Sequence, residues 1–145
     1  MKVRDILKVK GSHTFTIFED MNIGRALEIM SINNIGSLVV LNSSGRITGL
    51  ISEKEVLHLS FQNPNGIHDI VIKDVLSKNT IIVEPDDEIE YVEMVMTGEF
   101  IRHLPVVQDG RLVGLISIGD IVKSLTENIQ HENKYLRDYI NGKVY

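Results

Sequence analysis

Two tetrads in the chain have residue types and spacing that suit chemistry at the start of a helix. They are Ser117-Ile-Gly-Asp120 and Ser52-Glu-Lys-Glu55. A helix N-terminus offers unpaired N–H groups and a positive dipole end to an anion. A carboxylate nearby can accept from two adjacent hydroxyl groups at once. The same spacing also forms a capping box, in which Ser and the acid satisfy the helix's own N–H groups. The tetrads alone leave both interpretations open.

Both tetrads lie in a segment that occurs twice. Residues 45–57 return as residues 110–122, with glycine, arginine and serine in matching places and a constant separation of 65 positions. A chain of 145 residues that repeats a strand–turn–helix segment this closely is built from two copies of one unit. Two copies imply a pseudo-twofold axis and two related clefts between them.

Each copy is predicted to hold a leading helical turn and then a β-α-β-β-α unit. The first strands are rich in β-branched residues. The helices after them show the i, i+3, i+4, i+7 apolar spacing of one buried face. The predicted turns and strands are 3–7, 14–17, 37–41 and 47–51 in the first copy, and 72–76, 80–83, 104–107 and 112–116 in the second.

The repeat gives the domain boundaries. We expect a first repeat at 1–66, a second repeat at 67–125 and a helical tail at 126–145. The two repeats are expected to share one core, because each has too few residues to bury an adequate core alone.

The tail has an apolar face that permits two interpretations. Leu125, Ile129, Leu136 and Ile140 fall on one side of a helix, and Glu132 interrupts them. The helix folds back over its own domain, or it contacts a second copy of the chain. The spacing does not choose between these.

Composition excludes several classes of function. The net charge is −5 and no cluster of Lys or Arg stands out, which argues against nucleic-acid binding. The absence of cysteine excludes disulfides and thiolate metal sites. No apolar run is long enough for a membrane span, and the first residues lack the apolar core of a signal peptide. We expect a cytoplasmic protein that binds no membrane.

The two copies resemble the cystathionine-β-synthase (CBS) domain, whose tandem pairs are called Bateman modules. The best match is 103–107 followed by 110–120, and the resemblance covers roughly residues 1–125. It implies an α+β fold of two βαββα units packed sheet to sheet. It also implies a regulatory site for an adenine nucleotide or nucleoside in one or both clefts, and pairing into a homodimer. With nothing attached to the module, the regulated partner is expected to be a separate chain.

The resemblance also implies roles for particular residues. Ser117 would face a phosphate and Asp120 would hold ribose hydroxyls, which makes this cleft the expected principal site. The other residues that similarity places there are Thr80, Ile82, Arg102, His103 and Pro105. Arg102 or His103 would neutralise phosphate, and we expect positive charge only at this cleft.

The first copy departs from the family pattern, because Glu55 stands where Asp is expected. The extra methylene favours a carboxylate that reaches back to its own N-cap. Thr14, Ser37 and Ser52 still match positions around this second, weaker cleft. It is expected to be empty or to select a different ligand.

The favoured function is a ligand-sensing regulatory module that signals to a separate partner and needs no cofactor for its fold. Its candidate ligands are AMP, ADP, ATP and S-adenosylmethionine. The alternative is a structural assembly protein with vacant clefts. An enzyme is not expected, because the phosphate-loop, nucleophile-elbow and dinucleotide fingerprints are all missing. The five histidines lack metal-ligand spacing, and only His103 is assigned to a site.

Overall fold

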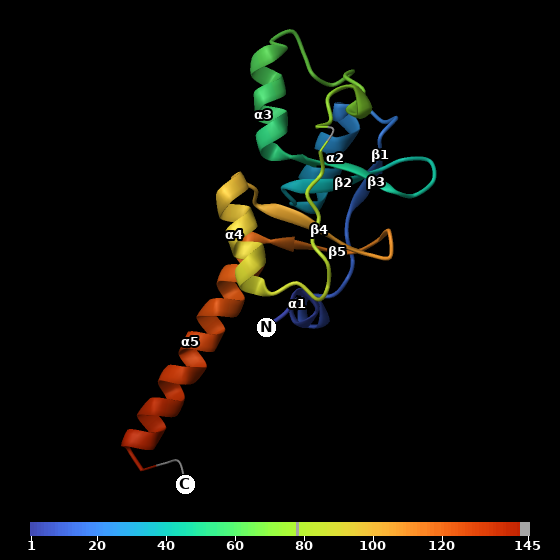
Figure 1. Cartoon of the computed structure of the whole chain (residues 1–145). Coiled ribbons are helices and arrows are strands. Elements are labelled where there is room, and N and C mark those ends of the chain that lie inside the picture. The colour runs from blue at the N-terminus through green and yellow to red at the C-terminus, as the bar shows by residue number, and fades with distance from the viewer. Residues whose placement is uncertain (78, 143–145) are drawn as a thin grey trace.

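The computed structural model describes residues 1–77 and 79–142 (Figure 1). The predicted α+β fold of two related units is confirmed. The first repeat contains α1 (Val3–Lys10), β1 (Thr16–Phe18), α2 (Ile23–Asn33), β2 (Ser37–Leu41), β3 (Ile47–Ser52) and α3 (Glu53–Gln62). The second contains the 3-10 turn η1 (Ile72–Asp74), α4 (Ile89–Glu99), β4 (His103–Gln108), β5 (Arg111–Ser117) and α5 (Ile118–Ile140).

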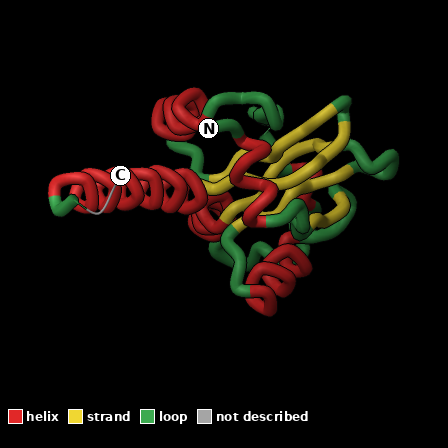
Figure 2. Tube along the Cα trace, turned by 90° about the horizontal axis from the view of Figure 1, so that it is seen from below, coloured by secondary structure: helices red, strands yellow, loops and turns green. Residues whose placement is uncertain are grey.

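The first repeat holds a three-stranded sheet in the order β1-β2-β3. β1 runs parallel to β2, and β2 pairs with β3 in an antiparallel register that sets Ser37 opposite Ser52. The strands of both repeats gather on one side of the body, with helices around them (Figure 2). This register brings the start of β2 beside the start of α3, where Glu53 N donates to the Gly36 carbonyl at 3.0 Å.

Among the described residues of the second repeat, β4 and β5 are the strands, and the strand predicted at 80–83 is reduced to a single bridge from Val83 to Val106. Val83 N donates to Pro105 O at 3.0 Å, and Val107 N donates to Val83 O at 2.9 Å. In the first repeat, the equivalent pairing of β1 with β2 is extended by one more hydrogen bond, which Val39 N donates to Phe15 O. Pro105 occupies the place of Val39 and has no N–H, so the ladder cannot continue to Ile81.

The two repeats exchange their leading segments. Val3 and Ile6 of α1 are buried in the core formed by α4, β4, β5 and α5 of the second repeat. Ile67 and Ile72, which precede the second repeat's strands, are buried in the core of the first. The prediction of one shared core is therefore corrected to two cores, each built from residues of both repeats.

A pair of glycines makes this exchange possible. A Cβ on Gly114 would lie 2.8 Å from the Leu7 side chain, and a Cβ on Gly49 would lie 2.9 Å from the Leu76 side chain. Each leading segment thus packs directly on the backbone of the other repeat's last strand. The recurrence of Gly49 as Gly114 is explained by this close approach.

The predicted tail is, as far as Ile140, the continuation of α5, which runs unbroken from Ile118 to Ile140. Residues 143–145 of the predicted tail lie outside the described residues. The helix leaves the body and extends away from it (Figure 1). Ile129, Leu136 and Ile140 are 58%, 54% and 79% exposed. The interpretation in which the tail folds back over its own domain is therefore wrong. No helix within the described residues is long and apolar enough to cross a membrane.

Candidate functional site

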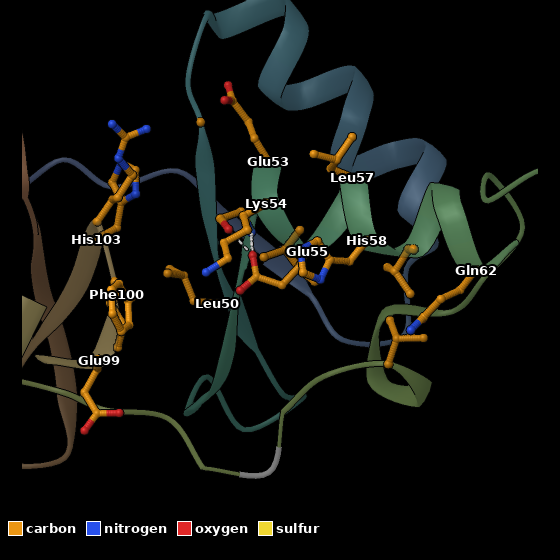
Figure 3. A pocket seen from close by; sticks show the side chains of 17 residues that line it. Leu50, Glu53, Lys54, Glu55, Leu57, His58, Gln62, Glu99, Phe100 and His103 are labelled. Carbon is orange, nitrogen blue, oxygen red and sulfur yellow. Dashed lines mark hydrogen bonds between the residues drawn. The ribbon is translucent and has the colours of Figure 1, made fainter. Parts of the chain in front are cut away.

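A cavity of about 650 Å³ lies at the boundary between the two repeats. One wall is formed by the end of β3 and one face of α3, and the opposite wall by residues 99–103, which join α4 to β4. Figure 3 shows the two walls facing each other, with Glu55 and His58 on α3 and Phe100 and His103 across from them. The volume is within the range of small-molecule sites.

The α3 wall begins with a satisfied capping box. Ser52 N donates to Glu55 Oε2 at 2.9 Å, and the Ser52 hydroxyl also bonds to Glu55. The prediction that Glu55 reaches back to its own N-cap is confirmed. Both bonds use one carboxylate oxygen, and the Glu55 side chain remains exposed at the cavity.

Arg102 and His103 form part of the wall that faces Ser52 and Glu55. The expectation that positive charge is available only beside Ser117 and Asp120 differs from the structure, because Arg102 lines the cavity of the first repeat's tetrad. Burial lowers the pKa of the His103 imidazole, and the cations Lys10 and Arg102 lower it further. His103 is therefore uncharged at pH 7.

The fixed charges of the cavity are mixed. Among the described residues that line it, the carboxylates are Glu53, Glu55 and Glu99, and the permanent cations are Lys54 and Arg102. With His103 neutral, negative charge exceeds positive charge. The cavity is thus a poor match for a ligand with several negative charges.

Phe100 has an unusual backbone on the β4 side of this cavity. It ends α4 in the left-handed conformation, with φ 55° and ψ 41°, which a bulky residue rarely adopts. Its side chain is 80% exposed and lines the cavity. The equivalent residue of the first repeat is Asn34, which has nearly the same φ and ψ and is suited to them.

Ser117 and Asp120 also form a capping box, as their spacing predicts. Ser117 N donates to Asp120 Oδ2 at 2.8 Å, and Asp120 N donates to the Ser117 hydroxyl at 3.1 Å. Neither residue is part of the cavity wall described above.

Lys10, at the end of α1, is already bound to Asp120. Its ammonium lies 2.6 Å from Asp120 Oδ2 and 2.7 Å from the Leu115 carbonyl. Burial acts to raise the pKa of the Asp120 carboxyl, but hydrogen bonds from Lys10 and Ser117 hold that pKa below its ordinary value. A sugar diol that used Asp120 would compete with Lys10.

The remaining predicted residues lie in different environments, and none of them lines the cavity described above. Ser37 is 4% exposed in β2, and Pro105 is buried in β4. Thr80 is half-buried, and its hydroxyl lies 3.4 Å from the Thr48 carbonyl. Ile82 is 42% exposed. Thr14 is half-buried, and its hydroxyl donates to Ser12 O at 3.3 Å.

Sequence reasoning missed His58 and Lys10. His58 lines the cavity with Glu55. The three-residue spacing on one helix could have revealed it, because such residues share a face. Lys10 had no comparable signal, since it reaches Asp120 from the other repeat and 110 positions away.

The fold and the cavity define a tandem-repeat module with a space of small-molecule size between its repeats. The chain belongs to the CBS domain family, whose model matches residues 3–61 and 72–127. The match covers both repeats and the first part of α5.

Two similar proteins are CBS domain-containing proteins by name. The mitochondrial CBS domain-containing protein CBSX3 of Arabidopsis thaliana is 26% identical, over 97% of this chain and 72% of that protein. The CBS-domain containing protein ATU1752 of Agrobacterium tumefaciens has a structure with a TM-score of 0.82 at 30% identity, covering 86% of this chain and 98% of that one.

A second similar structure has bound ligands. The CBS domain pair of protein MJ0100, in complex with 5'-methylthioadenosine and S-adenosyl-L-methionine, has a TM-score of 0.77 at 25% identity. It covers 88% of this chain and 98% of that chain.

Proposed function

We propose that this protein is a regulatory module that binds an adenine-containing small molecule in the cavity between α3 and residues 99–103. The observation that carries the proposal is the cavity itself, which brings the N-terminus of α3 opposite Arg102 and Phe100. Phe100 presents an exposed aromatic face on which an adenine ring can stack. Exposed Glu55 can accept hydrogen bonds from ribose hydroxyls.

The charge of the cavity refines the class of ligand. Three carboxylates, two cations and a neutral His103 favour a neutral nucleoside or a sulfonium compound over a nucleoside triphosphate. The ligands of the MJ0100 pair are of this chemistry. We therefore expect methylthioadenosine and S-adenosylmethionine to bind more tightly than AMP, and AMP more tightly than ATP.

Calorimetry on charge variants tests the site. Glu55→Gln keeps the capping box, because Gln serves at that position as well as Glu. It should weaken binding of the cationic S-adenosylmethionine more than that of neutral methylthioadenosine. Arg102→Ala should weaken AMP binding and strengthen S-adenosylmethionine binding. If both variants bind all these ligands like the parent, the cavity is not the site.

The cleft at Ser117 and Asp120, predicted to be the principal site, is proposed as a second binding position that opens when Lys10 leaves. Asp120→Ala should weaken a ligand bound there by about 1.5–3 kcal/mol, the scale of a lost charged hydrogen bond. If Asp120→Ala weakens ligand binding and Glu55→Gln does not, the cleft at Ser117 and Asp120 is the principal site.

In the proposed regulatory role, the protein forms a homodimer in the cytoplasm and signals to a separate partner protein. The alternative function is an assembly protein with vacant clefts, and a thermal-shift screen separates the two. A ligand at 100 times its dissociation constant stabilises the folded chain by about 2.7 kcal/mol. An unchanged melting temperature with every adenine compound would favour the assembly protein. Sedimentation of a monomer at micromolar concentration would contradict the homodimer.

A further inference from the structure

The part of α5 beyond the body has an apolar face that continues the face buried in the core. Ile121 is 1% exposed, and Leu125 packs against the second repeat's core. Ile129, Leu136 and Ile140 follow at helical spacing on the same side. Their exposed fractions lie between 54% and 79%.

A single helix that projects from a body gains little from its own hydrogen bonds. Isolated helices of about 12–15 residues are marginal in water, and helices in proteins depend on packing of an apolar face. Glu127, Lys134 and Asp138 lie on the side opposite that face, while Glu132 interrupts the face itself. The tail therefore has the pattern of a helix that packs against one partner along one side.

We propose that this partner is the same segment of a second copy, packed antiparallel along residues 125–140. Four aliphatic positions of the tail are arranged symmetrically about the point between Glu132 and Asn133. Leu125 and Ile140 are equally far from that point, and so are Ile129 and Leu136. A twofold contact requires a surface that is complementary to itself. Antiparallel pairing sets Leu125 opposite Ile140 and Ile129 opposite Leu136, over about 24 Å of helix.

The polar residues at the centre fit the same arrangement. In this register, Glu132 of each copy lies opposite Asn133 of the other. The Asn amide offers two N–H donors to the carboxylate, so the polar interruption is satisfied twice by symmetry. A parallel pair would instead place Glu132 beside Glu132 in the apolar seam, where like charges are destabilising. A polar residue in the seam that finds a hydrogen-bond partner in just one register favours that register over the others.

Cross-linking tests the register directly, because the chain contains no cysteine. Ile129→Cys and Leu136→Cys are made as separate full-length variants, and each is oxidised alone and as an equal mixture. Both positions are more than half exposed, so the fold should be retained, as circular dichroism checks. We expect a disulfide-linked dimer in the mixture and none from either variant alone. Identical positions lie about 10 Å apart along the antiparallel helices, beyond disulfide reach.

The opposite results overturn the proposal. No cross-link in the mixture rejects the contact, and cross-linking of a single variant indicates parallel pairing. Because the readout depends only on the tail, it is independent of ligand binding and of any dimer formed through the body.

A second variant tests the polar centre. Asn133→Asp sets a carboxylate opposite Glu132 at an exposed position. The tail-mediated dissociation constant, followed through the yield of cross-linked mixture at increasing dilution, should rise by roughly tenfold. Asn133→Gln keeps the amide and is the matched control, for which the yield should stay near that of the parent pair. An unchanged yield for Asn133→Asp rejects the register even if the tails meet.

Discussion

Phe100→Asn is expected to stabilise the fold and to weaken ligand binding at the same time. Phe100 ends α4 with φ 55°, a conformation that costs an ordinary side chain about 1–2 kcal/mol. Asn34 has φ 51° at the equivalent position of the first repeat and shows that the fold accepts Asn there. Because the Phe100 side chain is 80% exposed, little buried apolar area is lost when it is replaced.

The magnitudes follow from these two properties. Relief of part of the backbone cost should raise the free energy of unfolding by roughly 1 kcal/mol, which corresponds to about 2–4 °C in melting temperature for a chain of this size. Stacking of a base on an aromatic side chain contributes about 1–3 kcal/mol. Its loss should weaken binding roughly 5- to 150-fold.

Urea unfolding and titration calorimetry measure the two effects on one protein. The matched control is Asn34→Phe, which places the bulky residue in the first repeat's left-handed position, away from the cavity wall. It should lower stability by about 1 kcal/mol and leave affinity unchanged. If Phe100→Asn lowers stability and binds ligand like the parent, Phe100 has a packing role and the stacking argument fails.

Three further predictions concern the second cleft, acid stability and the interlocked cores. Lys10→Met and Asp120→Asn should show a coupling of about 1 kcal/mol in a double-mutant cycle, the upper range for a partly exposed ion pair; additive effects would contradict the pairing. Because folding lowers the pKa of His103, the unfolded chain binds more protons below about pH 6.5. Stability should therefore decrease as the pH falls from there towards the folded-state pKa, and His103→Gln should flatten that decrease in urea titrations. Residues 1–66 and 67–125 should not fold when expressed separately, and circular dichroism of a folded half would refute the exchange of leading segments.

The sequence predicted the features that depend on nearby residues. The capping boxes of Ser52 and Ser117 follow from spacing within one turn, and both are present. The Asp109-Gly110 pair joins β4 and β5 with positive φ at both residues, as such pairs do in tight hairpins. These features were predictable because the turn or cap is favoured by the residues themselves.

The features that were mispredicted depend on distant residues. The strand at 80–83 was expected from its β-branched composition, but the bridge stops at Val83 and Val106, because the next residue of β4 that would have to donate is Pro105, which has no N–H. Arg102 was expected beside Ser117, and its carbonyl does accept a hydrogen bond from Ile118 N at 2.8 Å. The sequence did not predict that Arg102 also lines the cavity with Ser52 across the repeat boundary. Such pairing is set by how two cores dock, which a periodic pattern within one repeat does not specify.

The exchange of leading segments connects the two proposed binding positions to the stability of the whole chain. α1 is held in the second repeat's core through Val3 and Ile6, and its last residue, Lys10, reaches Asp120. A ligand that displaces Lys10 must therefore act on a segment that also packs against Gly114 through Leu7. The cavity at α3 is also lined by a leading segment, since Val75 of the second repeat forms part of its wall and the neighbouring Leu76 packs on Gly49. A ligand that binds at Asp120 and displaces Lys10 would have a direct means to move α1.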